Sequence, residues 1–207
     1  MVVVKLALSI DGRIATDAGT SRWISAGESR AVVAEMRGAA QAVVVGVGTV
    51  LADDPGLLGP SAPGPVPVVF DTHGRTPSGA RLTQGPQRAL LVTGPNVADR
   101  ADAQVVRVVV GADGHVDAAA GLDALGARGL DHVLVEGGGG LVRGLLDAGR
   151  VDRVVVFVAG VWLPGGRAAA GGPSVAALEA LGRWQLVDLR RVGPDAMMTW
   201  EPPKHRG

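Results

Sequence analysis

Residues 132–147, HVLVEGGGGLVRGLLD, decide the fold because they predict a strand, a glycine loop and a helix in immediate succession. Residues 132–135 predict a buried strand because 133–135 are valine, leucine and valine, and Glu136 stands at the strand's end. Four glycines follow, at 137–140. Apolar residues then recur at helical spacing over residues 141–146. A strand, loop and helix of this kind are typical of a layered α/β protein.

The glycine loop has two interpretations. Glycines let a backbone approach a ligand closely, and the helix behind them presents unpaired N–H groups that suit a phosphate. The alternative is a flexible connection, since the chain holds 32 glycines and a run of four is then less surprising. The loop alone therefore leaves nucleotide binding as a hypothesis.

Composition narrows the class of protein. The 207 residues suit a single domain, expected over residues 1–201, with a disordered tail at 202–207. Lys plus Arg and Asp plus Glu number 20 each, which argues against a nucleic-acid-binding or membrane-binding surface. The absence of cysteine and the four scattered histidines argue against a metal site, so we expect no metal.

No targeting or membrane segment is predicted. The apolar start of the chain is interrupted by Lys5 and lacks the long apolar core of a signal peptide. The apolar run at 154–163 is too short to span a bilayer. We therefore expect a cytoplasmic protein.

The rest of the chain extends the same pattern. Strands are predicted at 2–9, 42–47, 66–70, 89–93, 105–109, 132–135 and 151–159, and short helices at 50–55 and 174–181. A helix ending near Ala40 begins with the capping-box pattern Ser25 to Glu28, and Asp117 is expected to cap another helix. Residues 184–191 and 196–200 predict a closing hairpin. We expect an α/β fold with a mixed, mainly parallel sheet flanked by helices and a C-terminal antiparallel hairpin.

Three loops follow strands of this sheet. They are residues 46–49, Asp71 with Thr72, and residues 136–140. In open α/β sheets, ligands bind outside the carboxyl ends of the strands. We therefore expect these loops to form one site.

Several motifs resemble a known family. They are VKLALSIDG at 4–12, SRWIS at 21–25, GTVLADDP at 48–55 and EGG at 136–138, and they occur in the order found in the reductase domain of the riboflavin-biosynthesis deaminase–reductase. The resemblance implies a dihydrofolate-reductase-like fold and a homodimer. It also implies NADPH-dependent reduction of a phosphoribosylamino-pyrimidine to its ribitylamino form.

The resemblance also implies roles for individual residues. Lys5 and Glu136 match the positions expected to be catalytic, and His73 and Arg75 are candidates for the 2′-phosphate of NADPH. The implied NADPH-binding residues are Ala7, Trp23, Thr49, Asp53, Thr72, Gly138, Gly139, Gly140 and Leu141, within a segment that continues to Gly144. The implied substrate-binding residues are Lys5, Ser21, Arg37, Leu57 and Glu136.

Taken singly, most of these residues have a structural alternative. Trp23 suits an ordinary core, Asp53 a turn cap and Arg37 a helix-end cation. Lys5 is different, because an ammonium inside an apolar strand must be paired or must face a cleft. Glu28 resembles the carboxylate that assists protonation in dihydrofolate reductases, but the capping box explains it equally well.

Two departures from the family bear on function. The cysteine signature of the zinc deaminase is absent, so we expect the reductase without deamination. Pro60 stands where the family has an arginine that contacts the substrate phosphate. Either Arg37 or another basic group binds the phosphate, or the substrate carries none there.

Three functions remain open. The first is the riboflavin-pathway reductase, with direct hydride transfer to an imine carbon and the loop at 11–21 as a lid. The second is a relative redirected to another imine or to a pterin such as dihydrofolate, and the third is a catalytically silent dinucleotide-binding protein. A common fold does not decide among them.

Overall fold

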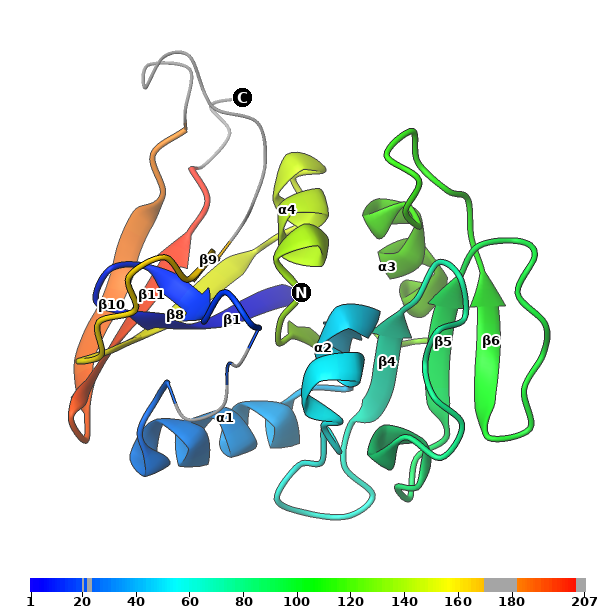
Figure 1. Cartoon of the computed structure of the whole chain (residues 1–207), viewed down its shortest axis with the longest axis horizontal. Coiled ribbons are helices and arrows are strands. Elements are labelled where there is room, and N and C mark those ends of the chain that lie inside the picture. The colour runs from blue at the N-terminus through cyan, green and yellow to red at the C-terminus, as the bar shows by residue number, and fades with distance from the viewer. Residues whose placement is uncertain (20, 22–23, 170–181, 204–207) are drawn as a thin grey trace.

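A nine-stranded sheet dominates the computed structural model, which describes residues 1–19, 21, 24–169 and 182–203 (Figure 1). Its strand order is β10-β11-β8-β1-β7-β3-β4-β5-β6, and it is parallel from β8 to β6. At one edge β11 runs antiparallel to β8, and β10 to β11. The expected mixed, mainly parallel sheet with a closing antiparallel hairpin is confirmed. The strands are β1 (Val2–Ser9), β3 (Ala42–Gly46), β4 (Val66–Phe70), β5 (Ala89–Thr93), β6 (Ala103–Arg107), β7 (Val133–Val135), β8 (Arg153–Ala159), β10 (Gln185–Val192) and β11 (Asp195–Glu201).

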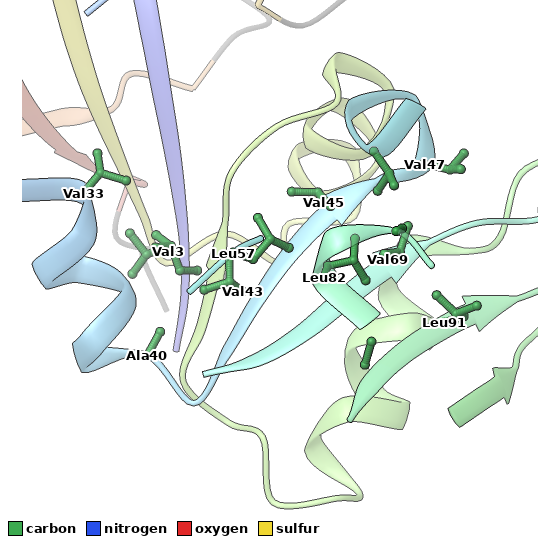
Figure 2. Packing of buried hydrophobic residues seen from close by; sticks show 14 of the residues in the cluster. Val3, Val33, Ala40, Val43, Val45, Val47, Leu57, Val69, Leu82 and Leu91 are labelled. Carbon is green, nitrogen blue, oxygen red and sulfur yellow. The ribbon is translucent and has the colours of Figure 1, made fainter. Parts of the chain in front are cut away.

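Helices cover both faces of this sheet. One apolar cluster joins α1 (Gly27–Ala39), α2 (Val47–Asp53) and the 3₁₀ turn η1 (Arg81–Thr83) to one face; Figure 2 shows its residues Val33, Val45 and Leu82. The other cluster joins α3 (Ala118–Gly126) and α4 (Gly139–Asp147), which lie side by side, to the opposite face (Figure 1). Because both faces are covered, β3 is an uninterrupted apolar run.

Most predicted elements are confirmed, several of them at their boundaries. The strands at 2–9, 66–70 and 89–93 match β1, β4 and β5, whereas β6 begins two residues before the predicted 105–109. The helix predicted at 50–55 begins earlier, at Val47. A small sheet of β2 (Arg13–Ala15) and β9 (Arg167–Ala168) was not predicted, because strands this short carry no periodicity. The helix predicted at 174–181 and residues 204–207 of the tail predicted at 202–207 lie outside the described residues.

The predicted capping box at the start of α1 is wrong. The N-cap is Ala26, and no local side chain caps the helix. Instead, the Asp195 carboxylate of β11 accepts hydrogen bonds from the Ala26 N–H (2.8 Å) and the Ser29 hydroxyl (2.6 Å). Asp195 is buried, so a tertiary acceptor replaces the local one.

Asp117, by contrast, caps α3 as predicted, accepting from the Ala120 N–H at 2.8 Å. None of the helices described is long and apolar enough to cross a membrane.

Candidate active site

A cleft of about 1460 Å³ runs along the carboxyl ends of β1, β3, β4 and β7. All three loops expected to form one site contribute to its wall. Of the residues proposed from the sequence, Trp23 lies outside the described part of the chain. The others that line this cleft are Lys5, Ala7, Ser21, Arg37, Thr49, Asp53, Leu57, Thr72, Glu136, Gly138, Gly139, Gly140 and Leu141.

An ion pair between Arg37 and Glu136 forms part of the cleft wall. Arg37 Nε donates to Glu136 Oε1 at 2.5 Å and Nη2 donates to Oε2 at 2.7 Å, which is a bidentate geometry. The Glu136 side chain is only 7% exposed, and its hydrogen bonds raise the pKa of Arg37. Arg37 is therefore not a solvated helix-end cation but the partner that holds the Glu136 carboxylate in place.

Lys5 lies beside this pair on β1. Burial lowers the pKa of its ammonium, and the Arg37 charge lowers it further, while the Glu136 charge opposes both effects. Within the described residues, Lys5 Nζ makes no hydrogen bond or ion pair, and the side chain lines the cleft. An ammonium inside an apolar strand is expected either to be paired or to face a cleft, and Lys5 faces a cleft.

The glycine loop brings the start of α4 to the cleft. Gly137 and Gly138 have φ values of 136° and 90°, which side chains rarely adopt. The Gly46 N–H donates to the Gly137 carbonyl at 3.3 Å, and a Cβ on Gly138 would lie 3.4 Å from the Gly46 backbone. The N-cap of α4 is Gly138, which has no side chain to cap the helix, and the first residues of α4 line the cleft. The unpaired N–H groups of this helix start therefore suit an anionic ligand.

Ser21 and Asp53 are joined across the site. Ser21 Oγ donates to Asp53 Oδ2 at 2.8 Å. The resemblance placed Ser21 with the substrate and Asp53 with the cofactor. Their hydrogen bond means that the hydroxyl can offer a ligand its acceptor lone pairs, while its proton is held by the carboxylate.

The buried Asp71 carboxylate shapes the loop after β4. It accepts from the Arg75 N–H at 2.9 Å and the Thr76 N–H at 2.7 Å. Thr72 Oγ1 in the same loop accepts from the Val116 N–H at 2.9 Å, which leaves the hydroxyl proton free to donate to a ligand.

The part of the cleft wall near Thr72 was not predicted from the sequence. Gly111, Asp113, His115 and Ala119 line the cleft there. The Asp113-Gly114 turn signal before the Asp117 cap could have indicated a loop at this place, but not which cleft it joins.

Two residues discussed from the sequence lie elsewhere. Glu28 does not line the cleft; its carboxylate packs on the hairpin turn, where a Cβ on Gly193 would lie 2.8 Å from Oε1. This position gives no support to a role of Glu28 in protonation, which stays a hypothesis from the resemblance. Pro60 is exposed and also outside the cleft wall, packed against Gly38 of α1.

Comparison with known proteins gives a consistent result. Residues 1–198 match the model of the RibD C-terminal domain. The 2,5-diamino-6-ribosylamino-4(3H)-pyrimidinone 5′-phosphate reductase of Archaeoglobus fulgidus is 32% identical over 79% of this chain and 82% of its own length. The protein of that name from Methanothermobacter thermautotrophicus is 35% identical over 80% of each chain.

Longer relatives match over about half of their length. The riboflavin biosynthesis protein RibD of Actinobacillus pleuropneumoniae is 31% identical over 96% of this chain and 56% of its own. Among solved structures, a deaminase and 5-amino-6-(5-phosphoribosylamino)uracil reductase from Thermotoga maritima superposes with a TM-score of 0.84 at 27% identity. That match covers 98% of this chain and 56% of the other.

Proposed function

The chain belongs to the RibD C-terminal domain family, a family of oxidoreductases of riboflavin biosynthesis, and we propose that it is a stand-alone NADPH-dependent pyrimidine reductase. Its proposed substrate is 5-amino-6-(5-phosphoribosylamino)uracil or the 2-amino analogue that the archaeal relatives are named for. The reducible group is the imine of the open-chain sugar or a cyclic C=N.

The Lys5, Arg37 and Glu136 cluster carries this proposal. A uracil-type ring offers N–H donors and carbonyl acceptors, which match the Glu136 carboxylate and the Lys5 ammonium. Arg37 holds the carboxylate in a fixed orientation through two hydrogen bonds, so the ring meets a preorganised pair of groups. Ser21 and Leu57 extend the proposed substrate side of the cleft.

The glycine loop supports a dinucleotide on the other side. Gly138, Gly139 and Gly140 with the start of α4 would hold a pyrophosphate through backbone N–H groups. Thr49 supports this role, since its hydroxyl lies 3.4 Å from the Cβ position of Gly137. The remaining residues proposed to contact the cofactor are Ala7, Trp23, Asp53, Thr72 and Leu141.

We propose that the loop after β4 makes the protein prefer NADPH to NADH. His73 and Arg75 line the cleft next to Thr72 and would neutralise a 2′-phosphate.

The chemistry divides between the cofactor and the chain. When bound, the nicotinamide would supply a hydride to the carbon of the protonated imine, which yields the neutral amine. The chain orients the two rings, excludes water, and directs the Lys5 Nζ donor and the Glu136 Oε acceptors at the substrate. No covalent nucleophile is required.

One assay tests the proposal. Purified protein is mixed with NADPH and, in turn, the phosphorylated uracil substrate, its 2-amino analogue, the dephosphorylated form and dihydrofolate, and loss of NADPH absorbance is followed. We expect turnover of one or both phosphorylated pyrimidines only. NADPH binding without turnover of any of them would indicate a silent dinucleotide-binding protein.

Pro60 favours the second candidate function. Proline lacks the guanidinium that the family uses at this position, so a substrate without a phosphate there would be accommodated equally well. Turnover of dihydrofolate or of the dephosphorylated pyrimidine at least as fast as the phosphorylated one would support this redirected reductase.

We also propose a homodimer and a cytoplasmic location. The homodimer is supported by β10, an edge strand whose Leu186, Val187 and Leu189 are exposed. The location is supported by the absence of cysteine, which fits a reducing compartment.

A further inference from the structure

Some of the cationic side chains that line the cleft are paired with another group of the chain, and others are not. Arg37 pairs with Glu136, Arg143 with Asp147 at 2.6 Å, and the guanidinium groups of Arg30 and Arg167 donate to the backbone carbonyls of Ser25 and Asp17. Among the described residues, no carboxylate or carbonyl group pairs with the side chains of Lys5, Arg75 and Arg81. An unpaired cation in a cleft is available to an anionic ligand.

Arg81 is held in place by its backbone. It opens η1, and its N–H donates to Asp54 Oδ1 at 2.9 Å, at the C-terminus of α2. The next residue, Leu82, is fully buried in the core beneath α2. The guanidinium therefore extends from a fixed point of the backbone.

The guanidinium lies beside the segment that carries Leu57. Arg81 Nη2 is 3.9 Å from the position that a Cβ on Gly56 would take. Both Gly56 and Leu57 line the cleft, and Leu57 is 2% exposed. Because Gly56 has no side chain, the space in front of Arg81 stays open.

We propose that Arg81 binds the phosphate of the substrate. This inference rests on the proposed function, in which Leu57 lies on the substrate side. A guanidinium forms paired hydrogen bonds to two phosphate oxygens, and Arg81 replaces the donor that is missing at Pro60. Arg75, the other unpaired guanidinium, follows Thr72 on the loop assigned to the cofactor.

The variants Arg81→Ala, Arg81→Lys and Gly56→Asp test this proposal. In Gly56→Asp the new carboxylate stands next to Arg81 Nη2 and occupies it while the arginine stays in place. A Cβ at Gly56 makes only ordinary contacts of 3.7 Å or more, so this variant is expected to fold. Arg128→Ala, at an exposed position just after α3 and outside the cleft wall, is the matched control.

We expect a selective effect on the phosphorylated substrate. In Arg81→Ala and Gly56→Asp its KM and its Kd rise roughly tenfold to hundredfold, while the KM for NADPH and the Kd for the dephosphorylated pyrimidine stay at their wild-type values. Arg81→Lys recovers part of the loss, since it keeps the charge but not the paired geometry. Arg128→Ala changes nothing.

Two outcomes would overturn the proposal. An equal rise in the Kd for the phosphorylated and dephosphorylated pyrimidines would show that Arg81 makes no phosphate contact. A rise in the KM for NADPH alone would assign Arg81 to the 2′-phosphate of the cofactor.

A binding measurement separates this proposal from the proposed function. Titration of the NADPH-bound protein with ribose 5-phosphate and with ribose is expected to show tighter binding of the phosphate, lost in Arg81→Ala. If the wild-type protein binds the two sugars equally, the Arg81 proposal is wrong even when the pyrimidine is reduced. If the phosphate preference is present and the pyrimidine is not reduced, the proposed function is wrong and the phosphate subsite remains.

Discussion

The single residue Glu136 acts on two neighbouring cations. Its two oxygens accept hydrogen bonds from Arg37, and its negative charge opposes the lowering of the Lys5 pKa by burial. Each carboxylate oxygen has a further lone pair, so the same group can still accept from a ring N–H. The charge of Glu136 therefore affects both neighbouring cations as well as the proposed substrate.

Glu136→Gln tests this role. The amide keeps the shape but loses the charge and can no longer accept two hydrogen bonds from Arg37. We expect kcat/KM to fall on the order of 100-fold, or about 2–3 kcal/mol of transition-state stabilisation, with the Kd for NADPH unchanged. Steady-state kinetics and NADPH fluorescence titration measure the two quantities. Loss of NADPH binding instead would place Glu136 on the cofactor side.

Lys5→Met is expected to stabilise the protein while removing activity. Burial lowers the pKa of Lys5 below its ordinary value of 10.5, so the folded state binds its proton less tightly than the unfolded state does. The resulting cost to stability is fully present below the lowered pKa and disappears as pH rises through 10.5.

Thermal unfolding at several pH values measures this effect. The Tm of Lys5→Met should exceed that of the wild type near pH 7, and the difference should shrink toward alkaline pH. A difference that grows with pH would contradict the assigned direction of the shift.

At the scale of elements, the closing hairpin and α1 stabilise each other. Asp195 accepts a hydrogen bond from the N–H of Ala26, the N-cap residue of α1, which lies 169 residues earlier in the chain, and Gly193 in the same turn packs on Glu28. The other end of α1 carries Arg37. The hairpin therefore supports the helix that positions the Glu136 carboxylate.

Asp195→Ala is expected to cost roughly 1–3 kcal/mol of stability, because it leaves the Ala26 N–H and the buried Ser29 hydroxyl without an acceptor. Ser29→Ala alone should cost less, and it should add little in the Asp195→Ala background. Denaturant unfolding of the two single variants and the double variant measures this coupling. Fully additive effects would mean that the two side chains do not act together.

Gly138→Ala tests the junction of β7 and α4. With φ at 90° an alanine is strained, at a cost of about 1–3 kcal/mol, and relief of the strain would move the start of α4. We expect the Kd for NADPH to rise about tenfold or more, because the pyrophosphate site depends on those N–H groups. Gly160→Ala, where a Cβ meets nothing within 4 Å, is the control. Unchanged NADPH binding in Gly138→Ala would separate this loop from the cofactor.

At the scale of the whole molecule, the two edges of the sheet differ. One edge is β10, with Leu189 60% exposed, and the other is β6, which Val109 (65% exposed) follows. Exposed apolar residues on a strand with unpaired backbone groups favour pairing with another chain. The β10 edge can pair with its own copy across a two-fold axis and so extend the sheet.

Leu189→Asp is therefore expected to convert a dimer into a monomer without changing the far-ultraviolet circular dichroism. Analytical ultracentrifugation at micromolar concentration measures the change, with Val109→Asp as the control at the opposite edge. If Val109→Asp dissociates the dimer and Leu189→Asp does not, the interface lies on β6. A wild-type monomer would contradict the proposed homodimer.

Local patterns were enough for much of the fold. The strands β1, β4 and β5 were predicted at their observed boundaries, because an apolar run and the turn residues that end it lie within a few positions of each other. The strand, glycine loop and helix at 132–147 were predicted for the same reason. Since parallel strands place their carboxyl ends at one edge, the loops that line the cleft could be predicted as well.

Contacts between distant residues could not be predicted in this way. Arg37 and Glu136 are 99 residues apart, and no local pattern distinguishes an arginine that pairs with this carboxylate from one that ends a helix in solvent. The capping box failed because the N–H of the N-cap residue requires only an acceptor within hydrogen-bonding distance, and the buried Asp195, instead of Glu28, accepts this bond from the far end of the chain. Arg81 likewise lies beside Gly56 only because η1 packs on α2. Strand and helix boundaries thus follow from neighbours in sequence, whereas the pairing of charges in the cleft follows from packing.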